Sequence, residues 1–117
     1  MEEKLILERY GVNRPMTFRL ASYCENDNLY VGLITHEEGY PERWSDLTVN
    51  LSVRCNENTA YIDTNNNGEE ILCWLMENKL GRLTGKERQS GWCLYPEFEF
   101  DIEELLKYTS EDIRKNK

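Results

Sequence analysis

The residue types that most often carry out chemistry are few in this sequence and stand far apart. Its 117 residues include one histidine, His36, and four cysteines, Cys24, Cys55, Cys73 and Cys93. An imidazole can activate a thiol as a nucleophile, so a Cys-His pair at His36 is one hypothesis for catalysis. The cysteines form no C-x-x-C pair, and no second His or Cys lies within four residues of His36. Zinc sites are usually built from such close pairs, so the spacing predicts no metal site, and we expect no cofactor.

A short basic segment interrupts an otherwise acidic chain. It contains Lys79, Arg82, Lys86 and Arg88, and Trp92 follows soon after. Cationic side chains beside aromatic ones can hold a single strand of nucleic acid by charge and stacking. The formal net charge of −8 repels phosphate backbones, however. Single-strand binding through a basic 79–88 loop is therefore an alternative to weigh, and nucleic acid is not the partner we expect.

Five carboxylates are concentrated near the C-terminus: Glu97, Glu99, Asp101, Glu103 and Glu104. The first three alternate with apolar residues, which predicts that they point out together from one strand. Such an acidic stripe can bind a protein with a basic surface, or imitate the phosphates of a nucleic acid. The alternative is that it is the solvated face of an antiparallel sheet.

Period-two alternation predicts the strands that position these residues. The predicted strands cover residues 4–10, 16–23, 29–35, 46–53, 59–63 and 91–100. Residues 46–53 alternate most regularly, with Leu47, Val49, Leu51 and Val53 on one face. Trp92, Leu94, Pro96, Phe98 and Phe100 share a face of the last strand in the same way. Segments 11–15, 36–44 and 83–90 are predicted to be turns or loops, because they are polar or contain Gly and Pro.

The period changes after residue 66 and predicts a helix over residues 67–80. Asn67 is a suitable N-cap, Glu70 completes a capping box, and Gly81 follows as a stop. The apolar face of this helix consists of Ile71, Leu72, Leu75 and Met76. Asp101 is predicted to cap a short C-terminal helix whose apolar side contains Ile102, Leu105 and Leu106. Residues 110–117 are charged and are predicted to form a frayed tail.

These elements predict an α+β fold. We expect a mainly antiparallel sheet of about five strands, covered on one face by helix 67–80, with the short C-terminal helix beside it. The length suits one domain spanning residues 1–117. Ile71, Leu72, Leu75 and Met76 should then be buried against Val49, Leu51 and the strand that starts near Trp92.

The composition and the absence of long apolar runs indicate the cellular compartment. Apolar residues make up 39% of the chain and charged residues 31%, which is typical of a folded polar domain. The N-terminus has no apolar run long enough for a signal peptide, and no segment approaches the roughly 18 apolar residues that span a bilayer. We therefore expect a cytoplasmic protein with reduced cysteines and no membrane contact.

Three segments carry a resemblance to a known family: residues 47–51 (LTVNL), 60–66 (AYIDTNN) and 90–100 (SGWCLYPEFEF). Together they resemble a family of small proteins with a domain of unknown function, carried on conjugative transposons and related mobile elements of gut bacteria. The similarity covers residues 16–108. It implies no catalytic residues. We therefore expect a non-catalytic protein-binding or regulatory module, and by analogy an inhibitor of a host defence nuclease that acts as a nucleic-acid mimic.

Overall fold

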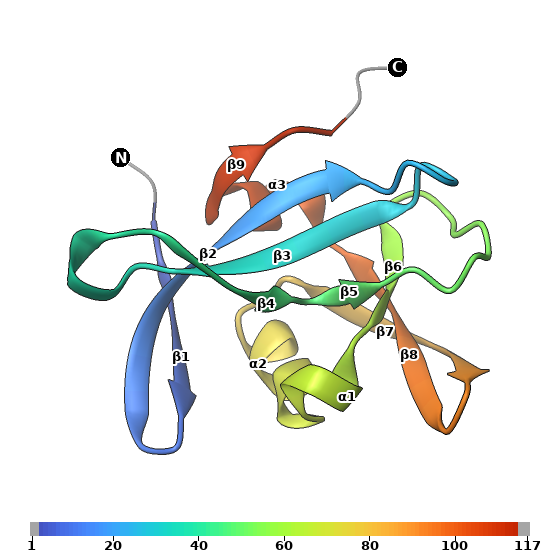
Figure 1. Cartoon of the computed structure of the whole chain (residues 1–117), viewed down its shortest axis with the longest axis horizontal. Coiled ribbons are helices and arrows are strands. Elements are labelled where there is room, and N and C mark those ends of the chain that lie inside the picture. The colour runs from blue at the N-terminus through green and yellow to red at the C-terminus, as the bar shows by residue number, and fades with distance from the viewer. Residues whose placement is uncertain (1–2, 115–117) are drawn as a thin grey trace.

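The computed structural model describes residues 3–114, and within this range the chain forms two β-sheets closed by short helices (Figure 1). The elements, in chain order, are β1 (Leu5–Arg9), β2 (Val12–Ser22), β3 (Leu29–Thr35), the 3-10 helix η1 (Glu37–Gly39), β4 (Glu42–Asp46), β5 (Thr48–Val49), β6 (Thr59–Ile62), α1 (Thr64–Asn67), α2 (Glu70–Glu77), β7 (Gly81–Ser90), β8 (Cys93–Phe100), α3 (Ile102–Leu106) and β9 (Thr109–Asp112).

The first sheet has the order β1-β2-β3-β4, with β9 pairing in parallel to β2. All other pairings in it are antiparallel. The hairpin of β2 and β3 confirms the alternation in the sequence, because Met16, Phe18 and Leu20 all face the core and are fully buried. β1 and β9 both pair with β2 on the side away from β3, at opposite halves of this long strand.

The chain crosses from the first sheet to the second at Leu47, between β4 and β5. The Leu47 amide donates to the Val31 carbonyl in the first sheet, and its carbonyl accepts a hydrogen bond from Asp63 after β6. The second sheet has the order β5-β6-β8-β7, all antiparallel. The inner faces of the two sheets supply the core, and β6 is so central that all four of its residues are buried.

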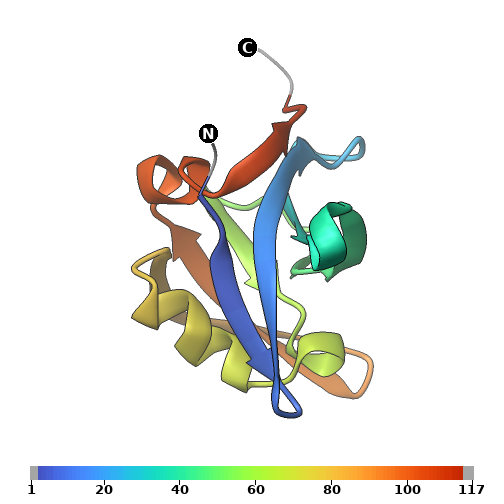
Figure 2. The ribbon, with the colours of Figure 1, turned by 90° about the vertical axis from the view of Figure 1, so that its left-hand side faces the viewer.

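Short helices close the space between the sheets. α2 buries Ile71 and Leu75, and its Trp74 donates a hydrogen bond of 2.8 Å to the Ile6 carbonyl on β1. α3 buries Leu105, and Asp101 caps it by accepting a hydrogen bond from the Glu104 amide, as the sequence predicts. Figure 2 shows both helices on the same side of the molecule, one above the other.

The predicted α+β fold is wrong, because no long helix covers a sheet in the described part of the chain. Segment 67–80 contains the last residue of α1, a break at Gly68 and the eight-residue α2. Asn67 is not an N-cap: its side chain is buried and donates to the carbonyls of Asp46 and Asp63. Asp63 caps the preceding helix instead. Met76, predicted to be buried, is 38% exposed.

The predictions for segments 46–53 and 83–90 are wrong. Segment 46–53 is not one strand: β5 covers two residues, and Ser52 has a positive φ of 61° that turns the chain. Segment 83–90, predicted to be a loop, belongs to β7. β7 is an edge strand exposed along most of its length, so its residues do not alternate in polarity.

Three further segments also differ from the predictions. Segment 11–15 belongs to β2 apart from Gly11, and segment 36–44 contains η1 and the start of β4. The predicted frayed tail begins inside β9, and residues 115–117 lie outside the described range.

Candidate functional site

Three of the predicted basic residues lie on β7, next to β8, which carries two of the predicted acidic residues. Arg82 on β7 pairs in register with Glu99 on β8, and their side chains form an ion pair of 2.6 Å. Glu104 on α3 likewise pairs with Lys107 at 3.0 Å. One ion pair, Arg82–Glu99, therefore joins the predicted basic and acidic residues, and Glu104 is paired with a lysine outside the predicted basic segment.

Glu97 is buried, whereas the sequence predicts that it points outward with Glu99 and Asp101. It lies opposite Tyr61 on β6, is only 6% exposed, and accepts a hydrogen bond of 2.8 Å from the Thr84 hydroxyl. Thr84 sits where the register between β7 and β8 shifts, so an irregularity in the edge strand supplies the donor. Of the predicted stripe, Asp101 and Glu103 are exposed and Glu99 is half-buried. The Asp101 side chain already caps α3.

The remaining basic residues lie on or beside β7. Lys79 occupies the turn after α2 with a φ of 62°, and Lys86 and Arg88 are exposed on the strand. Burial raises the pKa values of Tyr61 and Cys55, and the charge of Arg88 lowers both slightly. Because of this proximity we place Arg88 on the outer face of the second sheet, with Tyr61 and Glu97.

His36 lies in a groove of about 470 Å³ on the outer face of the first sheet. Its Nε2 is 2.7 Å from the Thr17 hydroxyl, which is also 2.7 Å from the Ser110 hydroxyl on β9. Thr17 is fully buried, although it is on the outer face of β2. Among the described residues, those lining the groove include no cysteine.

The cysteines do not line the groove that holds His36, which weakens the Cys-His hypothesis. Cys24 and Cys55 lie near the start of β3, whereas His36 follows its end, and a seven-residue strand spans about 20 Å. All four cysteines are free thiols. Burial, and then the charge of Glu97, raise the pKa of the Cys55 thiol, which makes it a poor nucleophile at neutral pH.

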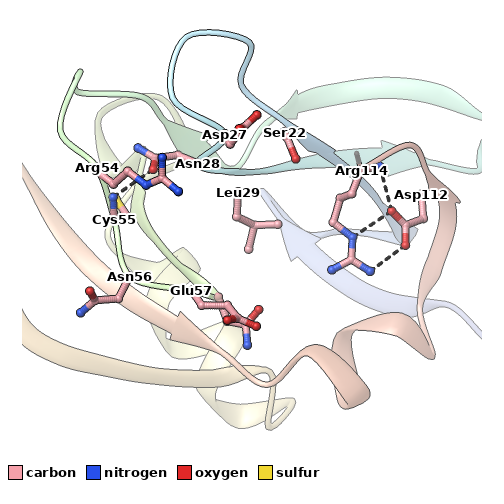
Figure 3. Close-up of a pocket in the computed structure, with 11 residues that line it drawn as sticks. Ser22, Asp27, Asn28, Leu29, Arg54, Cys55, Asn56, Glu57, Asp112 and Arg114 are labelled. Atoms are coloured by element: carbon pink, nitrogen blue, oxygen red, sulfur yellow. Dashed lines mark hydrogen bonds and ion pairs between the residues drawn. The ribbon is translucent and has the colours of Figure 1, made fainter. Parts of the chain in front are cut away.

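A second cleft, of about 750 Å³, lies beside Cys55 between the β2–β3 turn and the C-terminal segment (Figure 3). Arg54 enters it from one side and Arg114 from the other, with Leu29 between them. Arg114 is held by two hydrogen bonds to Asp112, at 2.9 and 2.8 Å. The cleft is polar and open. Its lining includes the Cys55 thiol but no histidine.

Asn28 is a buried residue in the lining of this cleft. Asn28 is 7% exposed; its amide donates to the Val53 carbonyl at 2.7 Å, and its carbonyl oxygen accepts from the Cys55 amide at 2.9 Å. A buried amide with its bonds satisfied fixes the loop that carries it. Among the side chains that the structure describes, no group of three or more His, Cys, Asp or Glu could hold a metal ion.

Exposed apolar side chains at the turn of the β7–β8 hairpin are the feature that sequence reasoning missed. Trp92 and Leu94 are predicted to face the core, but they are 101% and 57% exposed. The turn of the β7–β8 hairpin projects at the lower right of the molecule (Figure 1), and neither Trp92 nor Leu94 belongs to the core cluster. Gly91, with a φ of 61°, makes the two-residue turn that presents Trp92. The Gly-Trp pair after a polar segment is the signal that could have revealed this turn.

Fold and surface together define a mostly antiparallel β-protein of two sheets with an exposed aromatic hairpin. Residues 17–116 match the model of a family described as a domain of unknown function, DUF4313, and the chain belongs to that family. No curated protein and no solved structure matches the chain. No helix in the described range is long and apolar enough to cross a membrane.

Proposed function

We propose that this protein is a non-catalytic binding module that contacts a partner protein through the end of the β7–β8 hairpin. The observation that carries the proposal is the complete exposure of Trp92, with Leu94 57% exposed beside it. Trp is among the residues most enriched at energetically dominant positions of protein interfaces. Trp92 and Leu94 both lie outside the core cluster, and contact with another molecule is the role that we propose for them.

The partner class follows from charge. A net charge of −8 favours a protein with a basic surface over nucleic acid or an acidic protein. Asp101 and Glu103 remain exposed, and they supply part of this attraction, together with the half-buried Glu99. The sequence resemblance adds a setting, the cytoplasm of a gut bacterium that carries a mobile element. The role of nuclease inhibitor by nucleic-acid mimicry stays a prediction, and the burial of Glu97 shortens the stripe on which it depends.

Affinity capture from a gut-bacterial lysate tests this function. The wild-type protein should retain one or more proteins at low salt, and Trp92→Ser should lose them. Ile113→Ser is the matched control, since Ile113 is 53% exposed and directly follows β9, which Figure 1 shows at the opposite end of the molecule from the β7–β8 turn. High salt should weaken the retention if charge contributes. Equal capture by the wild-type protein and Trp92→Ser would exclude the hairpin as the contact surface.

Single-strand nucleic-acid binding is the second candidate, because the exposed Lys86 and Arg88 share the hairpin with Trp92. Base stacking on an exposed indole is the chemistry that such sites use. The net charge opposes it, and Arg82 is already paired with Glu99. Titration of a labelled oligonucleotide at low salt decides between the two functions: binding at micromolar protein that is lost in Trp92→Ser would favour nucleic acid.

A further inference from the structure

β7 forms an unpaired edge of the second sheet. It is the last strand in the order β5-β6-β8-β7, and its residues from 85 to 90 are all exposed. Within the described part of the chain, residues 82–90 form no backbone–backbone hydrogen bond beyond those that pair β7 with β8. Such an edge offers main-chain donors and acceptors to another extended segment.

The register with β8 shows which backbone groups point to the unpaired edge. Glu87 lies opposite Pro96, which has no N–H, so these two residues do not exchange the paired hydrogen bonds of an antiparallel ladder. The N–H and C=O of Glu87 therefore point away from β8, and those of Gln89, two residues on, do the same. The two-residue turn gives the same assignment, because Ser90 and Cys93, which flank it, form a hydrogen-bonded pair.

The usable part of the edge is short. The register of β7 and β8 shifts between Leu83 and Glu87, and Gly85 within this interval has a φ of 92°. A register shift of this kind bends the strand and interrupts regular pairing. An added strand can therefore pair only with residues 87–90, which we call the hairpin edge, directly before the turn that carries Trp92.

A second copy of this chain is a poor occupant of the hairpin edge. Antiparallel pairing joins residues whose backbones both point outward, so Glu87, when it pairs, meets either Glu87 or Gln89 of the second copy. The first register places two glutamates opposite each other, and the second places Arg88 opposite Arg88. The net charge of −8 on each copy adds to the repulsion. The occupant is therefore a segment of a different protein.

The charge of the hairpin is opposite in sign to that of the whole chain. Residues 85–96 contain two cations, Lys86 and Arg88, and one anion, Glu87, and all three are exposed. Exposed charges more than about 10 Å apart are largely screened at 0.1 M salt, so a strand on the hairpin edge meets these side chains and not the net charge of the chain. The edge therefore favours a segment that carries Asp or Glu. Nucleic acid shares that charge, but it has no peptide groups to continue the ladder.

We propose that the hairpin edge binds an extended, acidic segment of a partner protein as an added β-strand. The outward N–H and C=O groups of Glu87 and Gln89 pair with its backbone. Lys86 and Arg88 meet its carboxylates, and Trp92 packs on an apolar side chain. This proposal rests on the function proposed above, to which it adds the mode of contact and the chemistry of the contacting segment. Its acidic character is local, and the net charge of −8 still favours a basic surface elsewhere on the partner.

Selection from a phage library of random peptides tests the proposal with a defined probe. Peptides selected on the wild-type protein should be rich in Asp or Glu and should contain an apolar residue. Methylation of the backbone nitrogens of a selected peptide, one position at a time, should lower its affinity about tenfold or more at every second position. That alternation is the signature of a strand that pairs along one edge. The scan uses the wild-type protein, so it does not depend on the folding of any variant.

Gln89→Pro and Gln89→Ala form a matched pair of variants. Both remove the side chain, but only proline removes the outward N–H, and an edge strand tolerates proline where its N–H faces solvent. The selected peptides should therefore lose about tenfold in affinity with Gln89→Pro and should bind Gln89→Ala as well as the wild-type protein. Trp92→Ser should also weaken their binding. If Gln89→Pro lowers the midpoint of urea unfolding, the methylation scan alone decides.

The outcomes separate the two proposals. Loss of binding in Trp92→Ser, with a methylation scan that shows no alternation, leaves the proposed function in place and overturns the added strand. Binding that survives Trp92→Ser and Gln89→Pro overturns both proposals. Selection of basic peptides overturns the charge assignment. Failure to select any peptide, together with Trp92-dependent binding of a labelled single-stranded oligonucleotide, would show that nucleic acid is the ligand and would overturn the added strand.

Discussion

Replacing Tyr10 by Asn should stabilise the fold, although it removes an aromatic side chain. The residue has a φ of 52° and is 95% exposed, so the substitution relieves backbone strain and loses almost no buried area. A left-handed conformation costs a residue with a bulky side chain roughly 1–2 kcal/mol, and Asn tolerates it better. With Gly11 following, Tyr10→Asn creates the Asn-Gly pair that type I′ hairpins favour. We expect a gain of about 1 kcal/mol in the free energy of unfolding.

Equilibrium urea unfolding followed by tryptophan fluorescence measures this gain. The midpoint should rise while the slope m stays unchanged, since the surface exposed on unfolding hardly differs. Tyr40→Asn serves as the control, because Tyr40 is also exposed but has a φ of −104°. Its free energy of unfolding should change by less than about 0.5 kcal/mol. A midpoint for Tyr10→Asn that is unchanged or lower, or an equal rise for Tyr40→Asn, would refute the strain argument.

Three further predictions concern stability. Leu75→Ala should cost about 2–5 kcal/mol because Leu75 is fully buried, and Glu77→Ala, on the exposed side of α2, under about 0.5 kcal/mol; equal effects in a denaturant melt would contradict the assigned face. Gly81→Ala should cost more than Gly85→Ala: both have a positive φ, but a Cβ at Gly81 would lie 2.1 Å from a backbone carbonyl oxygen, while Gly85 has open space. Comparison of their melting temperatures checks this. Burial, and then the hydrogen bond to a carboxylate, raise the pKa of Tyr30 to about 12. The folded-state pKa of Tyr30 is above the unfolded value of about 10. Its contribution to the free energy of unfolding is therefore fully present below pH 10 and is lost as the pH rises from about 10 to about 12. Tyr30→Phe should flatten that loss in melts at graded pH.

Local patterns in the sequence determine several elements correctly. The strand at 29–35 and its pairing with β2 follow from alternation, because one face of this hairpin is buried in the core. The cap of α3 follows from Asp101, since capping needs only a side-chain oxygen and an amide within one turn. These features depend on neighbours along the chain, so composition and spacing suffice to find them.

Tertiary structure decides the features that depend on distant neighbours. β7 carries no periodic signal because it is an edge strand with few buried side chains. Alternation alone cannot tell that Glu97 lies beneath Thr84, or that Arg82 meets Glu99, because the register between β7 and β8 sets both contacts. The exposure of Trp92 and Leu94 is decided in the same way. Their strand alternates like a half-buried one, and only the tertiary structure places these two residues outside the core that Phe98 and Phe100 join.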